Sequence, residues 1–178
     1  MKLLDNIQIK KRLSFSFPLF LKKSLFLLVI FCFLLFSSGC ADVDDSGSES
    51  GLIEVKNLSQ IDEALVKGPV VLKLGSKSCI PCQKQEQVLS ELLPLYKESA
   101  SIMIIDVKEH PEFAARFGVR VIPDTCVITD IEDGKYMYIR QDGSKSSERA
   151  SARFLGVADK ETLSETLEKA LESRNIEE

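Results

Sequence analysis

The stretch Cys79-Ile80-Pro81-Cys82 constrains this chain more than any other, because it places two thiols three residues apart where the backbone pattern changes. Before it, Val70 to Leu74 is a short β-branched run introduced by Gly68-Pro69, which predicts a buried strand. After it, apolar residues recur at helical spacing. They are Val88, Leu89, Leu92, Leu93 and Tyr96. The two cysteines therefore fall where a strand gives way to a helix.

This position favours a reactive thiol at Cys79. Unpaired N–H groups and the positive end of the helix dipole stabilise a thiolate at a helix N-terminus. Cys82, one turn further on and more covered, is then the resolving thiol, and Pro81 suits the first helical turn. The spacing alone leaves three interpretations open: a redox pair, half of a zinc site, or coincidence.

A second motif begins downstream as Phe117-Gly118-Val119 and ends as Ile122-Pro123-Asp124, with Pro123 placed 41 residues after Cys82. Together the two motifs resemble the thioredoxin superfamily over roughly residues 52–171. The resemblance implies a cis Ile122–Pro123 bond, with Pro123 against the disulfide and nearby backbone free to pair with an extended substrate. The alternative is an ordinary trans proline that opens an edge strand.

The resemblance implies an α/β fold, a thioredoxin-like three-layer sandwich in which a mixed central β-sheet has helices on both faces. Apolar patterns predict strands over 52–55, 70–74, 102–107, 125–128, 135–140 and 150–156, and helices over 59–67, 80–93, 111–117 and from Asp159 onward. Ser59 with Asp62 predicts a capped helix start, and Pro94 predicts a kink or an end near Leu93. Residues 141–149 are an insertion or an extra strand whose purpose the sequence does not disclose.

The chemistry that the resemblance implies is thiol–disulfide exchange without a metal or an organic cofactor. Cys79 attacks, Cys82 resolves, and a Cys79–Cys82 disulfide is left. Ile80, Pro81, Ile122 and Pro123 form the substrate-binding surface. Family oxidases tend to carry histidine between the cysteines, so Ile-Pro favours a disulfide reductase. We therefore expect a monomer that acts on protein disulfides and receives electrons from a membrane thiol donor.

Several positions depart from the family pattern. Lys73 stands where thioredoxins have a buried acid; it would favour thiolates when charged, act as a base when neutralised, or extend its head into solvent. Ser78 replaces the usual tryptophan. Asp124 replaces a common threonine and is expected either to pair with Lys73 or to face water. Cys126 has three interpretations: a third redox thiol, a metal ligand that joins the pair, or a core residue.

The N-terminal residues 1–39 are predicted to be a signal peptide. They contain six basic residues and one acid, and then the 12-residue apolar run Leu25 to Phe36. Ser37-Ser38-Gly39-Cys40 is similar to a lipoprotein signal, in which Cys40 becomes the lipidated first residue. An uncleaved N-terminal anchor is the alternative. Either interpretation predicts an extracytoplasmic domain anchored to the membrane.

After the signal peptide, the composition predicts an acidic flexible tether over residues 40–51 and one domain over residues 52–178. Without residues 1–39 the chain keeps 17 basic and 26 acidic residues, and no basic patch interleaved with aromatics indicates nucleic-acid binding. Two rival functions remain open. One is a redox-inactive peptide-binding module. The other is a copper carrier, although such carriers typically space their cysteines one residue wider and add a histidine.

Overall fold

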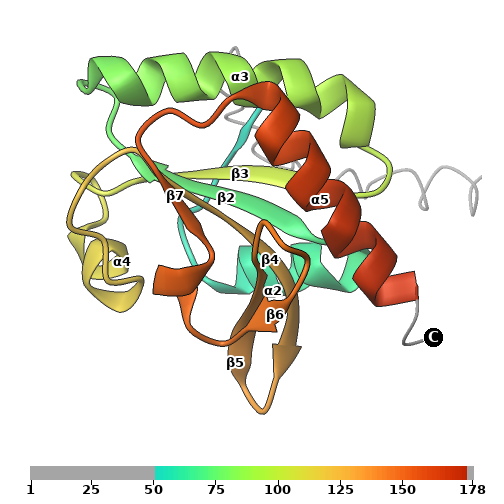
Figure 1. Cartoon of the computed structure of the whole chain (residues 1–178). Coiled ribbons are helices and arrows are strands. Elements are labelled where there is room, and N and C mark those ends of the chain that lie inside the picture. The colour runs from blue at the N-terminus through green and yellow to red at the C-terminus, as the bar shows by residue number, and fades with distance from the viewer. Residues whose placement is uncertain (1–50, 176–178) are drawn as a thin grey trace, which may run out of the picture. The chain divides into compact units, whose positions relative to one another are not determined.

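The computed structural model describes residues 51–175 of the chain (Figure 1). The predicted signal peptide, the lipidation site Cys40 and all but the last residue of the predicted tether lie outside the described residues. Within residues 51–175, every helix is too short or too polar to qualify as a membrane span.

A seven-stranded mixed sheet organises the described residues. Its strands are β1 (Ile53–Glu54), β2 (Val70–Gly75), β3 (Ser101–Asp106), β4 (Asp124–Glu132), β5 (Lys135–Ile139), β6 (Lys145–Ser146) and β7 (Arg153–Leu155). The strand order is β1-β3-β2-β4-β5-β6, and β7 also pairs with β4. β1, β3 and β2 are parallel, whereas β4 runs antiparallel to β2 and to β5. The sheet is therefore mixed, as predicted.

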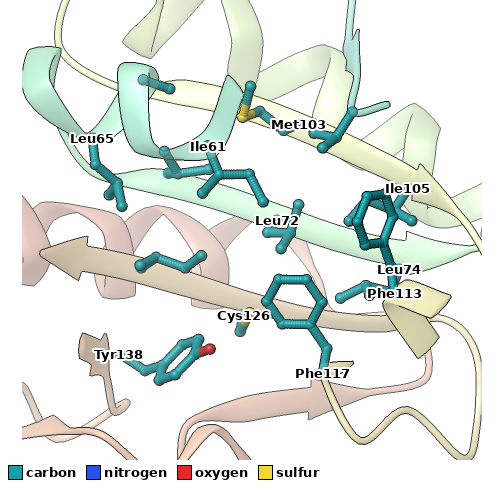
Figure 2. Packing of buried hydrophobic residues seen from close by; sticks show 14 of the residues in the cluster. Ile61, Leu65, Leu72, Leu74, Met103, Ile105, Phe113, Phe117, Cys126 and Tyr138 are labelled. Atoms are coloured by element: carbon teal, nitrogen blue, oxygen red, sulfur yellow. The ribbon is translucent and has the colours of Figure 1, made fainter. Parts of the chain in front are cut away.

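Helices cover both faces of this sheet, which confirms the predicted three-layer arrangement. They are α2 (Ser59–Lys67), α3 (Ile80–Tyr96), α4 (Pro111–Arg116) and α5 (Lys160–Asn175), with a short 3-10 helix η1 (Arg149–Ser151). One apolar cluster joins α2 and α4 to the sheet and includes Ile61, Phe113 and Cys126 (Figure 2). The other joins α3 and α5 to the opposite face and includes Leu89 and Leu163. The apolar side chains of β2 divide between the two clusters by their alternation, with Val70, Leu72 and Leu74 in the first and Val71 in the second.

Two predicted helix ends are wrong. Ser59 is the first residue of α2, not its cap, and its hydroxyl bonds to the Asn57 side chain. Pro94 lies inside α3, which continues to Tyr96. A proline this close to the helix end removes one internal hydrogen bond, and the helix closes beyond it through the bond from Lys97 N–H to the Leu93 carbonyl. By contrast, Asp159 caps α5 as predicted, since it accepts from Thr162 N–H at 2.8 Å.

The predicted C-terminal strands differ from the structure in length and in number. The strand predicted over 125–128 extends to Glu132, because its second half pairs with β5 across the Asp133-Gly134 turn. The strand predicted over 150–156 divides into η1 and the three residues of β7. Residues 141–149, predicted as an insertion or an extra strand, contain the extra strand β6.

Candidate active site

A disulfide joins Cys79 and Cys82 at the start of α3, with their Cα atoms 5.1 Å apart. Cys79 is the residue that caps the helix, and its sulfur accepts the Cys82 N–H at 3.3 Å. Cys79 is half-buried, whereas Cys82 has no exposed surface. Ile80 and Pro81 lie between them on the exposed side of the first helical turn. An approaching substrate can therefore reach the first sulfur but not the second.

The Ile122–Pro123 peptide bond is cis. Leu74 on β2 pairs with Asp124 on β4, and the two strands are antiparallel. The residues that follow β2 and those that precede β4 therefore lie off the same end of the sheet. This register brings the Cys79–Cys82 segment and the Pro123 segment to one edge of the molecule.

Exposed apolar side chains gather at the same edge. Beyond Ile80, they are Val121, Leu155 and Val157. Leu155 pairs with Asp124, and the Gly156 N–H donates to the Pro123 carbonyl at 2.9 Å, so both neighbours of Gly156 lie beside the proline. These three residues were not predicted as part of the site, because an apolar side chain that stays exposed has the same sequence pattern as a buried one.

Asp106, at the end of β3, holds the loop that leads into the cysteines. Its carboxylate accepts the backbone N–H of Lys77 at 2.9 Å and that of Lys108 at 2.8 Å. Burial alone would raise the pKa of Asp106, but these backbone hydrogen bonds and one from Glu109 hold that pKa below its ordinary value. Ser78, in this loop, is exposed and accepts a hydrogen bond from Lys108 Nζ at 2.6 Å.

Lys73 is buried, with 1 % of its surface exposed, so the predicted extension of its head into solvent is wrong. It pairs with Glu86 of α3, with Nζ and Oε1 2.5 Å apart. A Cβ on Gly75 would lie 2.7 Å from Lys73 Nζ and 3.1 Å from the Cys82 sulfur. The lysine nitrogen and the buried sulfur therefore border the same small space, which Gly75 leaves open. Glu86, one turn after Cys82 on α3, was not predicted as part of the site.

Asp124 is fully buried and contacts neither Lys73 nor water, so both alternatives expected for it are wrong. Its partners are two arginines, Arg149 from the region predicted as an insertion or an extra strand and Arg153 from the strand predicted over 150–156. Arg149 NH2 lies 2.5 Å from Asp124 Oδ1, and Arg153 NH1 lies 3.2 Å from Asp124 Oδ2. A buried carboxylate needs such partners, because without them its desolvation is costly.

Cys126 lies apart from Cys79 and Cys82. It is fully buried on β4 and packs in the cluster that faces α2 and α4, whereas Cys82 belongs to α3 on the opposite face of the sheet. Burial raises the pKa of the Cys126 thiol to about 11, and the neighbouring Arg149 only partly offsets this. Cys126 is thus the core residue among its three interpretations, and it does not share a site with the cysteine pair.

Comparison with known proteins identifies the family. The thioredoxin family model matches residues 53–169. A thioredoxin from Staphylococcus haemolyticus is 36% identical over 74 residues, which cover 42% of this chain and 71% of that protein. A thioredoxin from Pyropia yezoensis is 26% identical over 120 residues, covering 64% of this chain and 96% of that protein.

The fold comparison agrees with the sequence comparison. The solved structure of Trichomonas vaginalis thioredoxin aligns with a TM-score of 0.53 at 21% identity, over 68% of this chain and 98% of that one. The family match covers the dithiol, the proline segment and the strands that place them at one edge. The chain therefore belongs to the thioredoxin family, and its Cys79–Cys82 pair makes it a thiol–disulfide oxidoreductase.

Proposed function

We propose that this protein is a membrane-tethered, extracytoplasmic reductase of protein disulfides. The observation that carries the proposal is the asymmetry of the dithiol, in which a half-buried sulfur caps a helix and its partner is fully covered. The Ile-Pro dipeptide between the cysteines supports the direction, since no histidine is placed there to stabilise the reduced form.

The first step is attack on the substrate. The Cys79 thiolate, stabilised by the Cys82 N–H and by the positive end of the α3 dipole, attacks one sulfur of a substrate disulfide. A bond forms between Cys79 and that sulfur, the substrate S–S bond breaks, and the other substrate sulfur leaves as a thiolate. In this step Ile80, Pro81, Ile122 and Pro123 bind the substrate chain.

The second step releases the product. The Cys82 thiolate attacks the Cys79 sulfur, the mixed disulfide breaks, and the second substrate sulfur leaves as a thiolate. Two electrons have then passed from the protein to the substrate, and the Cys79–Cys82 disulfide has formed. A thiol donor at the membrane returns the pair to the reduced form by the same exchange in reverse.

Lys73 contributes a positive charge to both steps. Its ammonium borders the same space as the Cys82 sulfur, and a cation at this place lowers the free energy of a thiolate nearby. Glu86 balances that charge from the solvent side of the pair.

Equilibration of the protein with glutathione buffers tests the direction. We expect Cys79 and Cys82 to join each other with a reduction potential closer to that of thioredoxin, about −270 mV, than to that of a strong oxidase, about −120 mV. A variant with serine at both positions is the control and should show no transition. A potential near the oxidase value would contradict the assignment as a reductase.

Fatty-acid labelling of the full chain in a bacterial host tests the tether. We expect the wild-type protein to incorporate a lipid and to sediment with membranes, because Cys40 ends a lipoprotein-like signal. Cys40→Ser should lose the label, while Cys32→Ser, in the apolar run, should keep it. A wild-type chain that remains unlabelled but membrane-bound would favour the uncleaved anchor.

A further inference from the structure

Residues 140–152, which we call the detour, connect β5 to β7, two strands that pair with the same edge of β4. β5 pairs with β4 from Ile128 onward, and β7 pairs with Asp124 to Cys126, so both lie on the side of β4 away from β2. The detour contains β6 and η1 and ends where β7 begins (Figure 1). The chain thus moves outward from β4 to pair β6 with β5, and returns to β4 beside the proline segment.

Arg149, in η1, joins the two ends of the loop that contains Pro123. Its NH1 donates to the carbonyl of Phe117, at the end of α4, at 2.9 Å. Its NH2 pairs with Asp124, the residue directly after Pro123. The guanidinium also lies over the Phe117 ring, 6.0 Å from its centroid. One buried side chain therefore spans the loop from its first residue to its last.

The segment that follows Arg149 connects the same loop to the dithiol helix. Arg153 holds the second oxygen of Asp124, and Gly156 N–H donates to the Pro123 carbonyl. Two residues later, Ala158 N–H donates to Gln85 Oε1 at 2.7 Å. Gln85 is buried on α3, three residues after Cys82. Residues 149–158, which we call the clasp, thus contact both halves of the active site.

We propose that Arg149 is a positioning residue for exchange with polypeptide disulfides, and that the clasp holds the Pro123 loop at a fixed place relative to the dithiol. A binding surface that is already ordered spares a bound chain the entropic cost of ordering it. A small disulfide needs only access to the Cys79 sulfur and does not depend on the rest of that surface. The inference rests on thiol–disulfide exchange at Cys79.

The test compares two probes on full-length Arg149→Met: a disulfide-linked peptide and hydroxyethyl disulfide. We expect kcat/KM for the peptide to fall about tenfold, mainly through KM, while the rate with hydroxyethyl disulfide changes by less than about twofold. A purely structural role would lower both rates together, in proportion to the folded fraction.

Two matched variants test whether the effect on peptide kinetics comes from the clasp or from any change within residues 140–152. Arg140→Met removes an arginine whose side chain, among residues 51–175, bonds to Ser144 and to the clasp residue Ser151 but not to the Pro123 loop or to α3, and we expect its peptide kinetics to match the wild type. Arg149→Lys keeps the charge but cannot reach both partners, so its peptide KM should lie between those of the wild type and Arg149→Met.

Gln85→Met keeps the proposal testable if Arg149→Met does not fold. Gln85 Nε2 has no hydrogen-bond partner among residues 51–175, so this change removes only the acceptor for Ala158 and leaves the arginine pairs intact. We expect the same selective loss with the peptide. Equal losses with both probes, or unchanged peptide kinetics in both variants, would overturn the clasp. Wild-type protein that reduces neither probe would instead overturn exchange at Cys79 itself.

Discussion

Cys79→Ser is expected to reduce disulfide exchange by about a thousandfold or more, because a serine hydroxyl is not ionised at neutral pH and cannot begin the exchange. Cys79 is the sulfur that caps α3 and remains partly exposed, so no other thiol among residues 51–175 can take its place. The measurement is the steady-state rate of reduction of a disulfide-linked peptide, with dithiothreitol as the electron source.

Cys82→Ser is expected to stop the same cycle one step later. Attack by Cys79 still occurs, but no thiol follows to break the mixed disulfide, so the protein should accumulate as a covalent adduct with the peptide. Non-reducing electrophoresis and intact mass detect this adduct. Cys126→Ala is the matched control: the Cys126 thiol is buried with a raised pKa, and its loss should leave the rate unchanged. An adduct that forms on Cys79→Ser instead would reverse the two roles.

The features that could be predicted from the sequence are those encoded within short stretches. The strand from Val70, the helix after Cys79 and the proline start of α4 each follow from local patterns, and their order fits one known family. The last turn of α3, beyond Leu93, was not predicted. Local propensity places the helix end before Pro94, whereas the packing of α3 on the sheet carries the helix on to Tyr96.

The features that could not be predicted join residues far apart in the chain. Lys73 and Glu86 meet across a strand and a helix, and Asp124 meets Arg149 across 25 positions. Charged residues mostly lie on the surface, so solvent is one of the environments that the sequence predicts for Lys73 and for Asp124. Both are buried because each has a partner of opposite charge, and no local pattern indicates which partner that is.

Lys73→Met is expected to lower the reduction potential of the Cys79–Cys82 pair by about 30 mV, which corresponds to about 1.4 kcal/mol. The oxidised pair carries no charge, whereas the reduced pair forms a thiolate. Removal of the ammonium beside the Cys82 sulfur therefore destabilises only the reduced form. The measurement is the glutathione equilibrium at pH 7. Lys77→Met is the control, since Lys77 is exposed and already paired with Glu54 and Glu109; its effect should stay below about 10 mV.

Glu86→Gln is expected to shift the potential the opposite way, upward by a similar amount, because it leaves the Lys73 charge without its counter-ion. The two variants should also differ in stability. Glu86→Gln leaves an unpaired buried cation and should cost about 2 kcal/mol or more, whereas Lys73→Met replaces the cation with an apolar chain of similar length and should cost less than about 1 kcal/mol.

The double variant Lys73→Met/Glu86→Gln separates charge from packing. The Lys73 and Glu86 charges act on the thiolate in opposite directions, so the double variant, which lacks both, should have a potential between those of the two single variants and should recover most of the stability that Glu86→Gln loses. Potentials that move in the same direction in both single variants would show that the pair acts through the packing of α3. An unchanged potential in Glu86→Gln would contradict the assignment of the Lys73–Glu86 charges to the control of the potential.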